Sequence, residues 1–231
     1  MKLRKLLRTA SEAVTKLIFI AAGIIICAPV FLVVTGSVMG KGDLYECLAP
    51  VFEHGTGFVS WKLIPQYPTV ENYTRLLFYS PEFFVLFWNS VKMVGLILLG
   101  QMAVGIPAAW AFATYAVKGK NVLFTIYIVL MLLPFQVTML SSYLTLDRLS
   151  LLDTHWAVIL PAVFSTFPIF VIYGGFRAIP KSLIEAARID GAGEVYIFFM
   201  VGIGLGKGRI LSALVLGFLE YWNMIEQPFA F

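Results

Sequence analysis

The sequence predicts an all-α polytopic membrane protein, and three observations lead to this fold class. Hydrophobic residues make up 60% of the 231 positions, charged residues only 13%, and the mean hydropathy is +0.87. A water-soluble chain of this length could not bury so much apolar surface. Several runs with no charge, or with one, reach the length of about 20 residues that a helix needs to cross a bilayer. No soluble domain or low-complexity tract separates them.

Five apolar runs define the expected spans. The first, 17–39, follows a basic tail, 1–16, and precedes a long polar loop, 40–82. The other four lie in the remainder of the chain, 83–231, at 83–113, 122–144, 156–176 and 210–231. The first run is too long for a cleaved signal peptide and lacks a small-residue cleavage pattern, so we expect a retained helix.

The distribution of lysine and arginine predicts the orientation, because positive residues of short loops stay on the cytoplasmic side. The tail 1–16 holds five cations, and the stretch 177–209 holds five more. The loops at 40–82 and 145–155 hold four cations against seven acidic residues. These counts predict a cytoplasmic N-terminus, an extracytoplasmic loop 40–82 and a cytoplasmic segment 180–208.

One charged, alanine-rich segment, Pro180 to Ala192, stands between apolar runs on the expected cytoplasmic side. Ser182 and Glu185 have the S-x-x-E spacing of a capping box, which predicts a helix capped by Ser182. Gly191 predicts where that helix stops. Taken alone, the segment is as typical of an interfacial connector helix lying on the membrane as of a helix that grips a soluble partner.

Signatures of covalent chemistry are missing from the sequence. The glycine-rich run 202–208 has the wrong spacing for a phosphate-binding loop, and Gly208 stands where a magnesium-binding hydroxyl is required. His54 and His155 lie in separate loops without a ligand pattern, so no metal site is expected. We therefore expect neither an enzyme nor a cofactor bound by this chain.

The segment "IPKSLIEAARIDGAGEVYIFF" closely resembles the cytoplasmic loop of the inner-membrane permease subunits of ATP-binding-cassette importers, in the carbohydrate-type branch that includes the maltose permeases. The resemblance extends to "PTVENYTRLL", "WNS", "LPAVFSTFPIFVIYGGFRAIP" and "FLEYWNMIEQPFAF". It implies the type I importer fold, alternating access, and a prokaryotic plasma membrane as the location. It also implies four partners: a second homologous permease, two ATPase subunits that bind the ATP, and an extracytoplasmic solute-binding protein.

In that family the loop forms a coupling helix that docks in a cleft of the ATPase. Carried over to this sequence, the resemblance implies docking through Glu185, Ala186, Ala187 and Gly191, flanked by Arg188 and Asp190. Two departures stand out. Family members usually have proline at Gly204 and near Gly208, so a looser entry to the last span is expected. The family would also continue into a sixth span after Phe231, and we expect that span to be missing here.

Polar residues within the runs are the candidates for a solute pathway, because polar groups facing lipid are costly. This tentative set comprises Lys92, Glu220, Tyr221, Trp222, Asn223 and Glu226, with Gln101 as a weaker candidate. Each of them is at least as typical of helix–helix hydrogen bonding.

Two alternative functions stay open at this point. The first is an ion-coupled secondary transporter, to which only the two membrane-buried acids, Glu220 and Glu226, point. The second is a membrane-embedded enzyme, which would need a catalytic set assembled in space.

Overall fold

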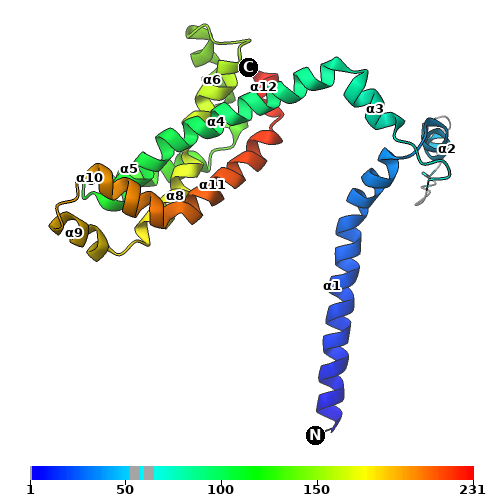
Figure 1. Ribbon diagram of the computed structural model, residues 1–231, viewed down its shortest axis with the longest axis horizontal. Coiled ribbons are helices and arrows are strands. Elements are labelled where there is room, and N and C mark those ends of the chain that lie inside the picture. Colours follow the sequence, from blue (N-terminus) through cyan, green and yellow to red (C-terminus); the bar gives the residue numbers. More distant parts are fainter. Residues whose placement is uncertain (1, 53–57, 60–64) are drawn as a thin grey trace. The chain divides into compact units, whose positions relative to one another are not determined.

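The computed structural model describes residues 2–52, 58–59 and 65–231, with side chains described from residue 12 onward. Helices form its secondary structure, together with an isolated antiparallel bridge between Met39 and Pro68 (Figure 1). The predicted loop 40–82 is thus described only in part, and His54 lies outside the described residues. The chain divides into two compact units, Met1–Val85 and Leu86–Phe231.

The first unit contains three helices: α1 (Lys2–Ser37), α2 (Lys41–Phe52) and α3 (Glu71–Phe78). The stretch Glu12–Ser37 of α1 is long and apolar enough to cross a membrane. Hydrogen bonds join α3 and the residues before it to the end of α1. The Asn72 side-chain amide donates to the carbonyl oxygens of Ser37 and Met39, at 3.2 and 3.0 Å, and the Thr69 amide donates to the Val38 carbonyl at 2.8 Å.

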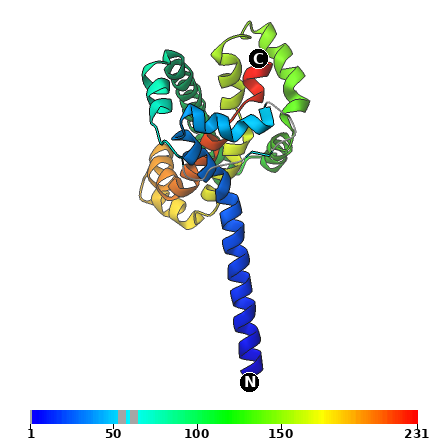
Figure 2. The same ribbon diagram turned by 90° about the vertical axis from the view of Figure 1, so that its right-hand side faces the viewer.

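The second unit is a helical assembly that begins within α4 (Pro81–Thr114), a helix that covers the predicted span 83–113. The following elements are α5 (Lys120–Met131), α6 (Phe135–Arg148), α7 (His155–Val163), α8 (Thr166–Arg177), α9 (Lys181–Ile189), α10 (Glu194–Ile197), the π-helical turn η1 (Phe198–Ile203), α11 (Gly204–Trp222) and α12 (Glu226–Ala230). Within this unit, α9 and α10 lie at the end opposite to α6 and α12 in both views (Figures 1 and 2).

Four helical stretches of the described residues are long and apolar enough to span a membrane, and a bent pair brings the number to five. That pair, α5 and α6, covers the predicted span 122–144 and bends by 102° at its break, a bend that the apolar run alone does not predict. Pro134 lies at the break. A proline has no N–H for the helical ladder, and its ring disfavours helical backbone at the residue before it.

The last span also differs from its prediction. A continuous helical stretch runs from Glu194 to Trp222 and ends before Asn223, whereas the sequence predicted 210–231. The predicted segment 180–208 therefore includes the first part of this helix, from residue 194 onward.

The glycine-rich entry to the last span contains two close contacts, whereas Gly204 and Gly208, on which the expected looseness rests, have open space around them. A Cβ at Gly206 would lie 2.4 Å from the Phe176 ring, and a Cβ at Gly202 would lie 2.9 Å from the Trp110 ring. Side chains at these positions would push α11 and η1 away from α8 and α4. Glycine here lets backbone approach aromatic rings across helices, as small residues do in membrane helix pairs.

Two buried clusters form the interior of the second unit. The larger joins α4, α8, α9, η1 and α11 around Trp110, Ile172 and Phe176. The smaller joins α4, α7 and the end of α11 around Ile97, Ile159 and Tyr221. The larger cluster includes Ile184 of α9, and the smaller cluster includes Tyr221 at the polar end of α11. The predicted docking segment and the predicted solute-pathway residues of α11 are therefore each attached to a buried cluster.

Candidate functional site

Helix α9 presents most of the predicted docking residues to solvent while its inner side is anchored. Ile184 is only 6% exposed and packs in the larger cluster with Phe176 and Ile179. Of the predicted residues, Glu185, Ala186, Arg188, Asp190 and Gly191 are exposed, and Ala187 is partly buried against the cluster. Helix α9 therefore exposes a short polar face to solvent, while its buried residue Ile184 attaches it to the larger cluster.

The start of α9 corrects the predicted cap. The helix begins at Lys181, after Pro180 in extended conformation, and no side chain caps it. Ser182 is therefore the second residue of the helix and cannot act as its N-cap. With Ser182 as N-cap the first helical residue would be Leu183, so the helix starts two positions earlier than the capping box requires. Pro180, whose ring fixes φ, directly precedes the first helical residue.

The end of α9 is a Schellman motif built on Gly191, which has a φ of +83°. The Gly191 amide donates to the Arg188 carbonyl at 3.1 Å, and the Ala192 amide donates to the Ala187 carbonyl at 3.0 Å. This pair of bonds satisfies two of the helix's last carbonyls and turns the chain sharply toward α10. The predicted helix stop at Gly191 is confirmed.

A network that sequence reasoning missed connects α9 to its neighbours. The Arg188 guanidinium donates to both carboxylate oxygens of Glu194, at 2.6 and 3.1 Å, and the Tyr115 hydroxyl donates to the same carboxylate at 3.0 Å. The pKa of Tyr115 is raised, mainly by burial of its hydroxyl and secondarily by the hydrogen bond to Glu194. The hydrogen bond to Glu194 also raises the pKa of Arg188. Bidentate pairing fixes the orientation of α9 relative to α10 and to the end of α4.

The polar end of α11 lies at a pocket of about 540 Å³ beside the α5–α6 bend. Glu220, Tyr221 and Gln227 line it, opposite Thr138 and Ser142 of α6. A smaller pocket of about 320 Å³ is lined by the predicted residues Glu220, Tyr221, Asn223 and Glu226, together with Gln227, Met224 and Ile225. The bend thus leaves space next to hydroxyl, amide and carboxylate groups.

The structure does not bring every pathway candidate to these pockets. Trp222 stacks on Phe218, with ring centroids 5.3 Å apart, and meets Phe87 edge-on at 6.0 Å. Lys92 is exposed on α4 and lines neither pocket. Nine residues separate Lys92 from the buried Gln101, which is about half a turn around the helix, so the two lie on opposite faces.

Gln101 is the best-connected polar residue in this region. It is 1% exposed, and its side-chain amide donates to the Ala162 carbonyl at 2.8 Å and to the Tyr221 hydroxyl at 2.9 Å. Gln136 of α6 makes a similar link to Glu226 at 2.8 Å. Gln101 therefore ties α4 to α7 and α11. In the sequence, the position of Gln101 within the apolar run 83–113 was the signal that could have predicted a buried amide.

Comparison with known families identifies the chain. The family model described as "binding-protein-dependent transport system inner membrane component" matches residues 101–225, which is more than half of the 231 residues. The protein belongs to this family. The matched range of this inner membrane component includes α9, Gln101 and the segment Glu220 to Asn223, whereas Lys92 and Glu226 lie outside it.

Relatives of this inner membrane component include sugar permeases. The arabinooligosaccharides transport system permease protein AraQ of Halalkalibacterium halodurans is 30% identical over 71% of this chain and 59% of its own length. The lactose transport system permease protein LacG of Rhizobium radiobacter is 31% identical over 62% of this chain and 53% of its own length. The chain thus spans little more than half the length of these two curated relatives.

The fold of this inner membrane component is shared with a solved transporter. A chain in the crystal structure of a bacterial ABC transporter involved in the import of the acidic polysaccharide alginate matches 92% of this chain and 70% of its own length. The TM-score is 0.77 at 20% sequence identity. This likeness shows the type I importer fold that the sequence predicted.

Proposed function

We propose that this chain is the membrane-spanning permease subunit of an ATP-driven, binding-protein-dependent importer, and that it works by alternating access. Its solute is a sugar or an oligosaccharide, which the names of the two curated relatives support. In this proposal, ATP is bound and hydrolysed by separate ATPase subunits. A second permease completes the pathway, and an extracytoplasmic solute-binding protein delivers the solute.

The observation that carries the proposal is the construction of α9. Its apolar residue Ile184 is held in the core, while Glu185 and Ala186 stay exposed, and the Gly191 turn and the Arg188–Glu194 pair fix both the end and the orientation of the helix. A short helix held this firmly can transmit a push from a partner without deforming. In the proposed topology, with the N-terminus in the cytoplasm of a prokaryotic cell, α9 faces the ATPase subunits.

The pockets at the end of α11 support the solute pathway. Hydroxyl, amide and carboxylate side chains around a space of about 540 Å³ can hydrogen-bond sugar hydroxyls, and the Tyr221 ring offers an apolar face. We propose Glu220, Tyr221, Asn223 and Glu226 as residues of this pathway. Trp222 and Lys92 would contribute through helix packing or in contact with the second permease.

The test is co-purification and uptake with the full set of subunits. Glu185→Gln should lose most of the ATPase that co-purifies and most of the ATP-dependent uptake of arabino-oligosaccharide or lactose. Glu71→Gln, which removes an exposed carboxylate from α3, is the matched control and should retain both. Uptake that persists without any ATPase subunit and follows an ion gradient would overturn the proposal.

A further inference from the structure

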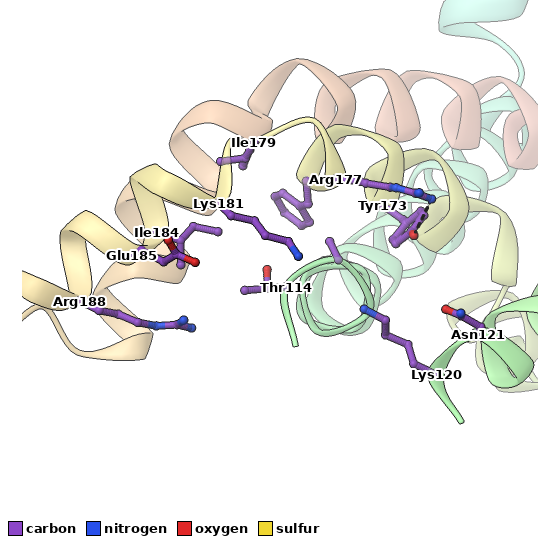
Figure 3. Close-up of a pocket in the computed structure, with 12 residues that line it drawn as sticks. Thr114, Lys120, Asn121, Tyr173, Arg177, Ile179, Lys181, Ile184, Glu185 and Arg188 are labelled. Carbon is purple, nitrogen blue, oxygen red and sulfur yellow. Dashed lines mark hydrogen bonds between the residues drawn. The ribbon is translucent and has the colours of Figure 1, made fainter. Parts of the chain in front are cut away.

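A polar pocket of about 400 Å³ lies beside α9 (Figure 3). It is formed where α4 ends at Thr114, α5 begins at Lys120 and α8 ends at Arg177. These three helices belong to stretches that are long and apolar enough to cross a membrane. The pocket is therefore at the level where the spans leave the hydrocarbon layer, the depth of the lipid headgroups.

Positive side chains dominate this pocket. Lys120, Arg177, Lys181 and Arg188 line it, against a single carboxylate, Glu185. Figure 3 shows their nitrogen atoms arranged around the space, with the Lys181 ammonium near its centre. A concave site lined by one sign of charge attracts the opposite charge more strongly than the same groups would on a flat surface.

Three of these cations make no ion pair with a carboxylate among the described residues. Arg188 is neutralised by Glu194, whereas Lys120 donates to a neutral acceptor, the Tyr115 carbonyl, at 2.9 Å. Arg177 donates to the Tyr173 hydroxyl at 3.2 Å, a second neutral group. Among the residues drawn in Figure 3, no hydrogen bond joins Lys181 to another.

The pocket also offers the geometry that a phosphate group needs. The Arg177 guanidinium carbon lies 5.9 Å from the centre of the Tyr173 ring, which holds the guanidinium in place. Thr114 and Asn121 also line the pocket and add a hydroxyl and an amide as neutral donors. Charge-assisted hydrogen bonds from arginine and lysine, supplemented by neutral donors, are the usual coordination of phosphate in proteins.

The surroundings of the pocket favour a lipid as the source of that phosphate. Val122 and Leu123 follow Asn121 in the first turn of α5, and both are exposed. They offer apolar surface to the acyl chains of a molecule whose headgroup enters the pocket. Basic pockets between spans at the cytoplasmic face of membrane proteins bind anionic headgroups in this way.

We propose that this pocket binds the phosphate of an anionic phospholipid, with Arg177 and Lys181 as its principal ligands. In the proposed topology the lipid belongs to the inner leaflet. It would lie against α9 and would hold the adjacent ends of α4, α5 and α8 together. The binding itself requires only that the chain span the membrane, so it is measured without any partner subunit.

The experiment is native mass spectrometry of the purified full chain in detergent, titrated with phosphatidylglycerol or with phosphatidylcholine. The pocket variant is Arg177→Gln with Lys181→Gln. Lys118→Gln with Lys207→Gln removes the same charge from exposed positions that do not line the pocket. Arg177→Lys with Lys181→Arg keeps the charge in place.

We expect the unmodified chain to retain phosphatidylglycerol in preference to phosphatidylcholine, and the pocket variant to bind it at least about tenfold more weakly. The control pair and the charge-keeping pair should retain binding. Equal loss in the pocket and control variants, or no preference between the lipids, would overturn the proposal. Displacement by inorganic phosphate at equal concentration would also overturn the lipid as the source.

One further outcome separates this proposal from the proposed function. If the pocket variant keeps its lipid but loses the co-purifying ATPase, the pocket receives protein carboxylates and the lipid proposal fails. If uptake fails in every variant while lipid retention follows the expected pattern, the lipid proposal stands and the importer proposal fails.

Discussion

The Gly191 turn gives the sharpest prediction about α9. Gly191→Ala places a side chain at a φ of +83°, where an L residue loses about 1–2 kcal/mol relative to glycine. No atom lies within 4 Å of the new Cβ, so the whole cost comes from the backbone. The population of the closed turn should then fall about five- to thirtyfold.

Hydrogen exchange measures this population directly. The amides of residues 191 and 192 donate to Arg188 and Ala187 only while the turn is closed. In Gly191→Ala, exchange of the peptide covering these residues should therefore accelerate by the same factor of about five to thirty.

Gly193→Ala is the matched control, because Gly193 has a φ of −70° and is equally open. Alanine fits there and should leave exchange unchanged or slow it, since it restricts the unfolded chain. Equal acceleration in the two variants would refute the reasoning, as would exchange in Gly191→Ala that matches the unmodified protein.

Three other predictions concern contacts outside the turn. Glu194→Ala should lower the pKa of Tyr115, because the carboxylate helps to raise it, and a phenolate absorbance titration against Tyr115→Phe would detect the change. Gly206→Ala should destabilise the protein by about 1–3 kcal/mol through overpacking, whereas Gly208→Ala, with open space around it, should have little effect on the thermal unfolding midpoint in detergent. Gln101→Leu should cost about 0.6–2 kcal/mol in the same measurement, and an unchanged midpoint would contradict its role in joining three helices.

The sequence predicted the features that depend on composition and local spacing. Apolar runs gave the membrane-spanning character, and the polar segment between them gave α9 with its stop at Gly191. The apolar run 122–144 did not reveal the bend between α5 and α6, because apolarity measures burial in lipid and says nothing about bending. The cause, Pro134, is visible in the sequence, but its effect depends on the space available for a 102° bend.

The remaining features depend on partners far apart in the chain. Tyr115 and Glu194 are 79 positions apart, and no local pattern pairs them. The sequence also did not reveal the contacts of Gly202 with Trp110 and of Gly206 with Phe176, because those rings lie on other helices. Gly204 and Gly208, where the family's prolines are missing, have open space around them.

The close contact of α8 with α11 has a consequence for movement. Gly175 lies against the side chain of Arg209, and Gly206 lies against Phe176, so α8 and α11 are closely packed at both points. Helix α9 connects these two helices in the chain. A displacement of α9 would therefore act on both helices together, whereas the α5–α6 bend, beside the pocket of about 540 Å³, takes no part in these two contacts.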